Sequence, residues 1–151
     1  MAGSTDVRLP VTGTFAFPFA LYYLWLAFRV GLQRLRQRVV LGDRVVASAS
    51  ATSEKPKPTG MDPLLQATRA QQNFNEYVPL ALFLAATAEL NGADPTWLTG
   101  ILASLFGLRL LHAELGIMMP SGLGFGRPVG FYGTSIIMVW LGGWATWLAL
   151  S

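Results

Sequence analysis

The sequence has no cysteine, a single histidine and few charged residues. Disulfide bonds, thiolate metal sites and a cysteine nucleophile are therefore excluded, and any reactive thiol must come from a ligand. Asp, Glu, Lys and Arg make up only 13% of the 151 residues, whereas hydrophobic residues make up 52%. Because this balance lies well away from that of ordinary soluble proteins, lipid is the expected solvent. No internal repeat occurs, and we treat residues 1–151 as a single transmembrane domain.

Long stretches without charge predict helices that cross a membrane. Residues 9–28 and 128–151 contain no charged residue, and about 20 apolar residues suffice to cross a hydrocarbon core of roughly 30 Å. Asp62-Pro63 and Asp94-Pro95 are typical of helix starts, with an N-cap residue followed by proline. The sequence thus predicts an all-α integral membrane four-helix bundle. The expected helices are 13–38, 63–91, 95–118 and 127–149, with a mobile linker at 42–62.

Positive charge is concentrated around that linker. Eight of the eleven Lys and Arg residues lie between positions 29 and 69. Since Lys and Arg near membrane ends favour the cytoplasmic side, we expect the linker and the connection at 119–126 to be cytoplasmic and both termini to be non-cytoplasmic. The formal charge of +3 then reflects topology rather than nucleic-acid binding, because the basic residues are not interleaved with exposed aromatic residues.

Polar side chains interrupt the predicted helix at 63–91. Their spacings of three and four residues put them along one helical face. A charged residue in a membrane helix costs a few kcal/mol unless it faces protein or water, so a stripe of this kind indicates a site or a polar interface. The stripe consists of Arg69, Asn73, Glu76 and Tyr77.

The two following helices carry similar residues at the same membrane depth. Arg109 and His112 come near the end of the helix at 95–118, and Arg127 and Tyr132 come at the start of the next. With the topology given above, all of them lie in the cytoplasmic leaflet. Arginine binds carboxylates well because its planar guanidinium matches them with two hydrogen bonds. The sequence therefore predicts a site for a small zwitterionic or anionic ligand on the cytoplasmic side, without a metal.

The stripe also matches the signature of a known family. Residues 69–79, RAQQNFNEYVP, closely resemble the motif Arg-Ala-Gln-x-Asn-x-x-Glu-Tyr-x-Pro of the MAPEG family, the membrane-associated proteins in eicosanoid and glutathione metabolism. Arg109 with His112, and an arginine followed five residues later by a tyrosine in the last helix, are similar to that family as well. The resemblance covers essentially the whole chain and is closest in look to the bacterial inner-membrane branch.

This resemblance implies a homotrimer, in the bacterial inner membrane or an endomembrane, that binds glutathione between subunits near the cytosolic surface. It implies that Arg127 stabilises the glutathione thiolate. The thiolate would conjugate a hydrophobic electrophile delivered from the lipid bilayer, as in a transferase, or reduce a lipid hydroperoxide, as in a peroxidase. The other glutathione-binding residues implied are Arg34, Arg69, Gln71, Asn73, Glu76, Tyr77, His112 and Tyr132. One subgroup of the family has tyrosine at the position of Phe131, so this chain lacks that hydroxyl.

Other interpretations of the same residues stay open. Polar residues in membrane helices also fix helix packing, and Arg69 suits contact with lipid headgroups. His112 fits a hydrogen bond to a neighbouring helix as well as a ligand contact, and Arg109 fits an ion pair with Glu114 or with Glu76. An arginine at the start of the last helix is also what topology requires. The alternative functions are a non-enzymatic lipid-binding or scaffold protein, which the same family includes, and an accessory subunit of a larger membrane complex.

Overall fold

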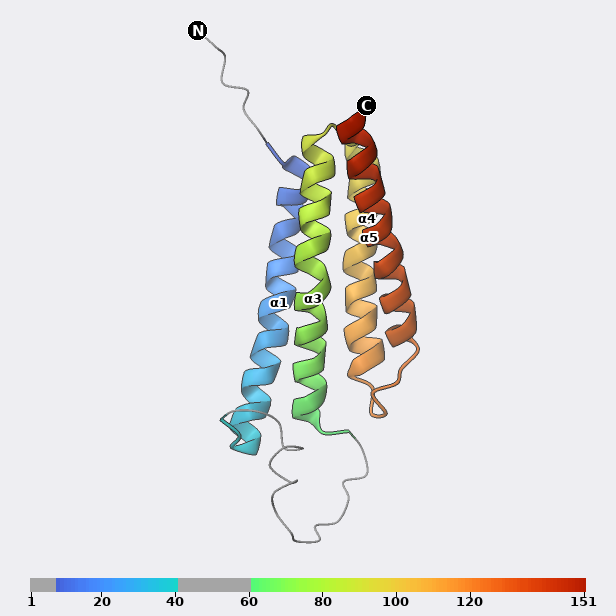
Figure 1. The fold of residues 1–151 in the computed structure, drawn as a ribbon. Coiled ribbons are helices and arrows are strands. Elements are labelled where there is room, and N and C mark those ends of the chain that lie inside the picture. The colour runs from blue at the N-terminus through green and yellow to red at the C-terminus, as the bar shows by residue number, and fades with distance from the viewer. Residues whose placement is uncertain (1–7, 41–60) are drawn as a thin grey trace.

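The computed structural model describes residues 8–40 and 61–151, which form helices and no strand. The helices are α1 (Pro10–Gln37), α3 (Pro63–Leu90), α4 (Pro95–His112), the π-helical turn η1 (Ala113–Ile117) and α5 (Gly126–Leu150). They run side by side in one elongated bundle, in which α1 lies beside α3 and α4 lies beside α5 (Figure 1). The predicted all-α four-helix bundle is confirmed.

The helix starts follow from local sequence at two positions and from tertiary structure at a third. The side chain of Asp62 accepts a hydrogen bond from the Leu64 amide, and Asp94 caps α4 in the same way. α1 begins at Pro10, three residues before the predicted start. Its first free amides donate to a carboxylate of α3, since Val11 N and Thr12 N lie 2.7 and 2.8 Å from the two oxygens of Glu89. The predicted linker 42–62 lies outside the described residues except at its end.

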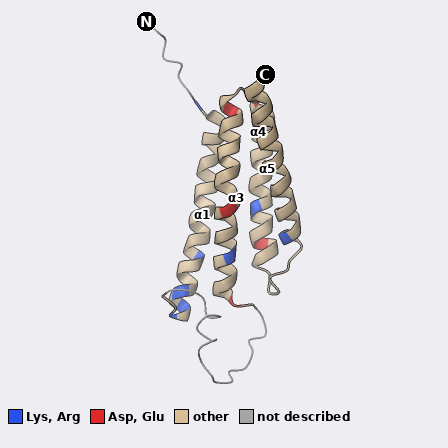
Figure 2. Cartoon of the chain, viewed as in Figure 1, with Lys and Arg blue, Asp and Glu red and all other residues tan. Residues whose placement is uncertain are grey.

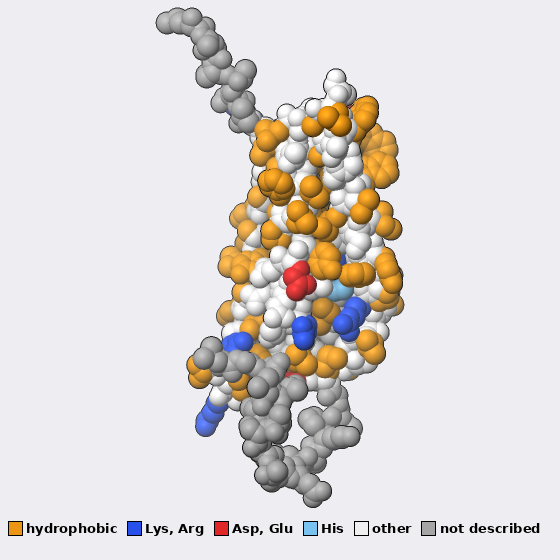
Figure 3. All heavy atoms as spheres, in the orientation of Figure 1, with side chains coloured by type: hydrophobic (Ala, Val, Ile, Leu, Met, Phe, Trp, Pro, Cys, Tyr) orange, Lys and Arg blue, Asp and Glu red, His pale blue; other side chains and the backbone are white. Residues whose placement is uncertain are grey.

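The exterior of the bundle is apolar, as expected of an integral membrane protein. Three helical spans in the described part of the chain are long and apolar enough to cross a membrane, namely α1, α4 with η1, and α5. α3 is not among them, because its polar stripe lowers its hydropathy, but it runs alongside the others over a similar length (Figure 1). Many large apolar side chains are exposed, and they are spread over the face of the bundle seen in Figure 3. The fully buried core contains Phe19, Leu26, Leu98, Leu102, Leu105 and Leu141.

The basic residues of the helices lie in one half of the bundle. This half contains the end of α1, the start of α3, the end of α4 and the start of α5 (Figure 2). It is the half that we expect to face the cytoplasm, and the sidedness itself stays a prediction. The residues singled out on α3, α4 and α5 all lie here, so the fold brings the polar segments of three helices to one level.

Candidate functional site

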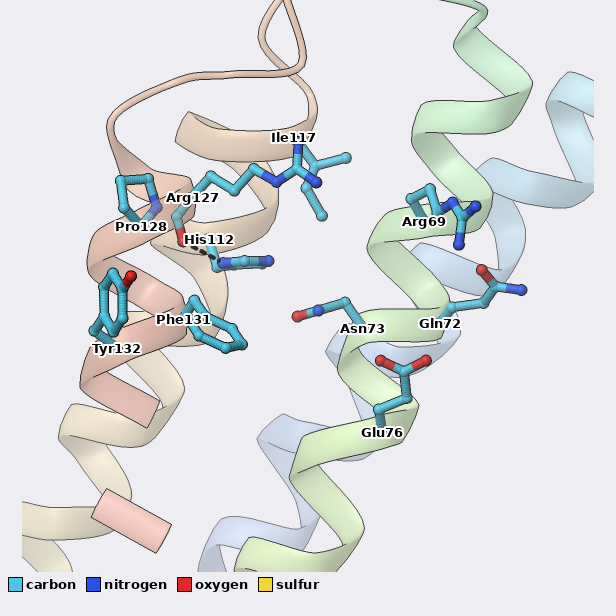
Figure 4. Close-up of a pocket in the computed structure, with 10 residues that line it drawn as sticks. All are labelled: Arg69, Gln72, Asn73, Glu76, His112, Ile117, Arg127, Pro128, Phe131 and Tyr132. Atoms are coloured by element: carbon cyan, nitrogen blue, oxygen red, sulfur yellow. Dashed lines mark hydrogen bonds between the residues drawn. The ribbon is translucent and has the colours of Figure 1, made fainter. Parts of the chain in front are cut away.

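A cavity of about 600 Å³ lies between α3 on one side and α4, η1 and α5 on the other. Its volume falls within the range of roughly 300–1,000 Å³ that is typical of small-molecule sites. We call it the polar cavity (Figure 4). It is lined by Arg69, Gln72, Asn73, Glu76, His112, Ile117, Arg127, Pro128, Phe131 and Tyr132. Six of the predicted site residues are therefore brought together around one space.

α3 contributes one polar wall of this cavity. Arg69, Gln72 and Glu76 are exposed, and Asn73 is half-buried. These residues recur at spacings of three and four along the helix, and all four line the cavity. In Figure 4 the Asn73 side chain points across the cavity toward α4 and α5, whereas Arg69, Gln72 and Glu76 do not point directly at these helices. Figure 3 shows the same region from outside, where basic, acidic and histidine side chains gather on one face amid apolar ones. The polar wall is thus open to a ligand rather than sealed by packing.

Arg109 lies behind this wall and joins three helices. Only 2% of the residue is exposed. Its Nη1 donates to Asn73 Oδ1 at 2.9 Å, its Nη2 donates to the Gly130 carbonyl of α5, and its guanidinium lies 5.3 Å from the centre of the Tyr77 ring. The ion pair with Glu114 or Glu76 that charge allowed is not among its contacts in the described part of the chain, where Glu114 pairs with Arg29 instead. Because Arg109 occupies the oxygen of Asn73, the amide nitrogen of Asn73 remains to donate toward the cavity.

The opposite wall is formed by the junction of η1 and α5. Arg127 lies in the first turn of α5, and its Nη1 donates to the Gly122 carbonyl at 3.0 Å. One of its five N–H groups is used there, which leaves donors for a ligand. His112 Nδ1 lies 2.8 Å from the Arg127 carbonyl. Because a carbonyl can only accept, Nδ1 carries a proton, and in the neutral ring Nε2 is an acceptor.

Glycine lets α5 approach α4 closely enough to build this wall. A Cβ atom placed on Gly130 would lie 2.7 Å from the Leu108 carbonyl oxygen and would overlap His112. A Cβ atom on Gly116 would lie 2.6 Å from the Arg127 backbone nitrogen. Any other residue at either position would push the two helices apart. The glycines therefore determine how near His112 and Arg127 lie to each other.

The charges around the cavity favour an anionic ligand. Arg69 and Arg127 supply two positive charges and Glu76 supplies one negative charge, so the lining has a net charge of +1 with His112 neutral. Arg109 adds a further cation behind Asn73. Within the part of the chain that the structure describes, no group of three or more His, Asp or Glu side chains could hold a metal ion.

Three predicted glutathione ligands lie elsewhere in the described chain. Tyr77 contacts Arg109 and meets the Phe131 ring edge to face at 6.0 Å between centroids, but it does not line the cavity. Gln71 is half-buried on another face of α3. Arg34 lies in the last turn of α1, where its Nη1 donates to the Val40 carbonyl at 3.2 Å. None of these three side chains lines the cavity.

Several residues of the site were not predicted from the sequence. Gln72 follows Arg69 by three residues and precedes Glu76 by four, so the helical spacing could have identified it. The partners of Arg109 required the fold. So did Gln66, a buried side chain of α3 whose Nε2 donates to the carbonyls of Ile117 and Met119 and holds the start of the connection between η1 and α5.

The pattern of the MAPEG family matches residues 12–147, which include every residue of the polar cavity. No curated protein matches the chain. The segment that matches the family therefore contains the whole lining of the polar cavity.

Proposed function

Because this chain belongs to the MAPEG family, we propose that it is a membrane glutathione transferase that binds glutathione in the polar cavity and stabilises its thiolate. The observation that carries this proposal is the set of charges around one cavity. Glutathione with a protonated thiol has two carboxylates and one ammonium group, and therefore a net charge of −1. The lining offers two arginines and one glutamate, a net charge of +1.

The groups of the lining also suit glutathione individually. Arg69 and Arg127 can each hold a carboxylate or thiolate through charge-assisted hydrogen bonds, and Glu76 can accept from the ammonium group. The amides of Gln72 and Asn73 suit the two peptide bonds of the ligand. Ile117, Phe131 and the ring of Tyr132 leave an apolar side to the same space. The cavity thus combines a polar half for glutathione with an apolar half for a second substrate.

In this proposal Arg127 stabilises the thiolate. A free thiol has a pKa of about 8.5 and is mostly protonated at neutral pH. A unit positive charge about 5 Å away contributes about 3 kcal/mol at an effective dielectric constant of about 20. A tenfold gain in thiolate requires only about 1.4 kcal/mol. One partly desolvated arginine is therefore sufficient, and Arg127 lies beside the apolar half where an electrophile would bind.

Glutathione would supply the nucleophile and the bilayer would supply the electrophile. In conjugation the sulfur forms a bond to an electrophilic carbon, and the electron pair leaves with the displaced group or moves onto a conjugated carbonyl. In a peroxidase reaction two glutathione molecules and one lipid hydroperoxide give glutathione disulfide, the lipid alcohol and water. Both reactions need the same thiolate, so we propose transferase activity with peroxidase activity at the same site.

We further propose that the protein acts as a homotrimer with the cavity facing the cytosol. α1 packs on α3 and α4 rather than across the cavity, so the cavity has no fourth wall within one subunit. A neighbouring subunit would supply that wall. Arg34, at the end of α1, would then reach the site of a neighbour, and this arrangement would give it the role that the family resemblance implies.

The proposal is tested by adding glutathione to the detergent-solubilised protein and recording thiolate absorbance in the ultraviolet. We expect a thiolate signal at neutral pH and an increase in melting temperature with glutathione. Arg127→Ala should abolish the signal, whereas Arg36→Ala, at an exposed arginine outside the cavity, should retain it. Absence of both the signal and the thermal stabilisation in the unmodified protein would refute the transferase.

A lipid-binding scaffold is the second candidate, and one observation favours it. An apolar groove of about 580 Å³ lies between α4 and α5. It is lined by Trp97, Ile101, Val139, Trp140, Gly143, Trp144 and Trp147. A scaffold, or an accessory subunit of a larger complex, would bind its lipid or partner without any thiolate signal, so the same measurement distinguishes these functions from the enzyme.

A further inference from the structure

A second polar cluster joins α1 to η1, outside the polar cavity. Glu114 Oε1 accepts a hydrogen bond from the Tyr22 hydroxyl at 3.0 Å and forms an ion pair with the Arg29 guanidinium. Tyr22 is buried, and about a quarter to a third of the Arg29 and Glu114 side chains is exposed. The Arg29 guanidinium also lies 5.5 Å from the centre of the Trp25 ring. Two donors and a neighbouring ring on α1 therefore hold one carboxylate of another helix.

This carboxylate belongs to η1, the five-residue π-helical turn that follows α4. The Met118 amide donates to the Ala113 carbonyl at 2.9 Å, five residues earlier, which is the π-helical spacing. Such turns are rare and short, and they occur frequently at functional sites. Because a π turn lacks the favourable packing of an α turn, it depends on outside contacts. The contacts of Glu114 with α1 are of that kind.

The backbone of η1 in turn determines where Arg127 lies. Gly116 contacts Arg127 so closely that a Cβ atom would not fit between them. The Gly116 carbonyl accepts from the Gly124 amide at 3.1 Å, and the Gly124 carbonyl accepts from the Arg127 amide at 2.9 Å. The turn is also bounded by two cavity residues, His112 before it and Ile117 at its end. A displacement of η1 would therefore move Arg127 and the wall of the cavity that His112 and Ile117 form.

We propose that Glu114 is a positioning residue for Arg127: its ion pair with Arg29 fixes η1 and thereby the Arg127 backbone beside the polar cavity. Glu114 does not line the cavity and would not touch the ligand. The consequence for the thiolate rests on the proposed function. The geometric part, in which α1 determines the position of Arg127, does not depend on it.

The test uses the full chain in detergent and two separate measurements. Hydrogen exchange of the segment 116–127, measured without glutathione, reports how firmly the backbone from η1 to Arg127 is held. The pH midpoint of thiolate absorbance, with glutathione bound, reports the effect on the thiol. The variants are Glu114→Ala, Glu114→Gln and the reversed pair Arg29→Glu with Glu114→Arg. Glu89→Gln is the matched control, because Glu89 also contacts α1 but at the opposite end of the bundle.

Glu114→Ala should accelerate hydrogen exchange in 116–127 several-fold. It should also raise the pH midpoint of thiolate absorbance by about half a unit, which corresponds to about threefold less thiolate at neutral pH. For Glu114→Gln, both the exchange rate and the thiolate midpoint should lie between those of the unmodified protein and Glu114→Ala, since glutamine retains a hydrogen-bond acceptor without the charge. The reversed pair should restore both readings to within about twofold of the unmodified protein. Glu89→Gln should lower the melting temperature and change neither reading.

The proposal is overturned if exchange in 116–127 is unchanged in Glu114→Ala, or if Glu89→Gln accelerates it equally. In the first case η1 does not need Glu114, and in the second the effect is general destabilisation. If the unmodified protein gives no thiolate signal, the proposed enzyme fails, and hydrogen exchange alone then decides whether Glu114 positions Arg127.

Discussion

A methyl group added at Gly116 should displace the cation of the proposed site. The Cβ atom of Gly116→Ala would lie 2.6 Å from the Arg127 backbone nitrogen and 2.8 Å from its Cα. Non-bonded carbon atoms are most stable at about 3.5–4.0 Å. The Arg127 backbone must therefore retreat by about 1 Å, because the contacting atoms are backbone and cannot rotate away.

The effect on the thiolate follows from this distance. With an effective dielectric constant of about 20, a cation 4 Å from the sulfur contributes about 4 kcal/mol and one at 5 Å about 3.3 kcal/mol. The difference of about 0.8 kcal/mol corresponds to about 0.6 pH unit in the thiolate midpoint, or about fourfold less thiolate at neutral pH. Crowding should also lower the free energy of unfolding by about 1–3 kcal/mol.

The assay is a pH titration of thiolate absorbance at saturating glutathione, with the melting temperature measured in parallel. Gly107→Ala is the matched control, since Gly107 lies in α4, the helix that continues into η1, but an added Cβ there meets nothing within 4 Å among the described residues. That variant should titrate like the unmodified protein. If Gly116→Ala melts at a lower temperature but has the same thiolate midpoint as Gly107→Ala, then the position of Arg127 does not control the thiolate.

Three further changes test the site and its orientation. Asn73→Asp keeps the acceptor for Arg109 but removes the amide donor and adds a negative charge. The free energy of unfolding should be retained, while the affinity for glutathione, measured by calorimetry, should fall about tenfold or more. Unchanged affinity would mean that the ligand binds elsewhere. Gln66→Leu removes the donor to the carbonyls of Ile117 and Met119, so the free energy of unfolding, measured by denaturant titration, should fall by about 1–3 kcal/mol. Unaltered stability would mean that these two hydrogen bonds do not stabilise the fold. Because the chain has no cysteine, Ser121→Cys and Asn91→Cys provide single labels, and an impermeant thiol reagent should reach only the first from the cytosol; the opposite result would invert the topology.

The helices and the polar stripe could be predicted because both depend on local sequence. Asp62 and Asp94 cap their helices through amides two residues later, an interaction that needs no other part of the chain. The facing residues of α3 recur every three or four positions, so Asn73 and Glu76 reach the same cavity by helical geometry alone. Gln71 and Gln72 mark the limit of this rule, since adjacent residues are about 100° apart and only the second faces the cavity.

The rest of the site depends on interactions between distant segments. Residues 113–117, near the end of the predicted helix 95–118, form a π turn. This turn changes the direction in which the side chains after His112 point, and no periodicity in the sequence indicates it. By charge Arg109 had two candidate partners, Glu114 and Glu76, but in the fold it donates to Asn73 and to a carbonyl of α5. The Glu114 carboxylate forms its ion pair with Arg29 of α1, and the sequence alone could not indicate that pairing.

The carboxylate that caps α1 has a consequence for how the protein is made. Glu89 accepts from Val11 N and Thr12 N, and 77 residues separate Thr12 from this acceptor in the sequence. During synthesis α1 leaves the ribosome long before residue 89 exists, so its first amides have only water or lipid headgroups as partners. The first turn of the first helix can therefore reach its final structure only after α3 has been synthesised and inserted beside it.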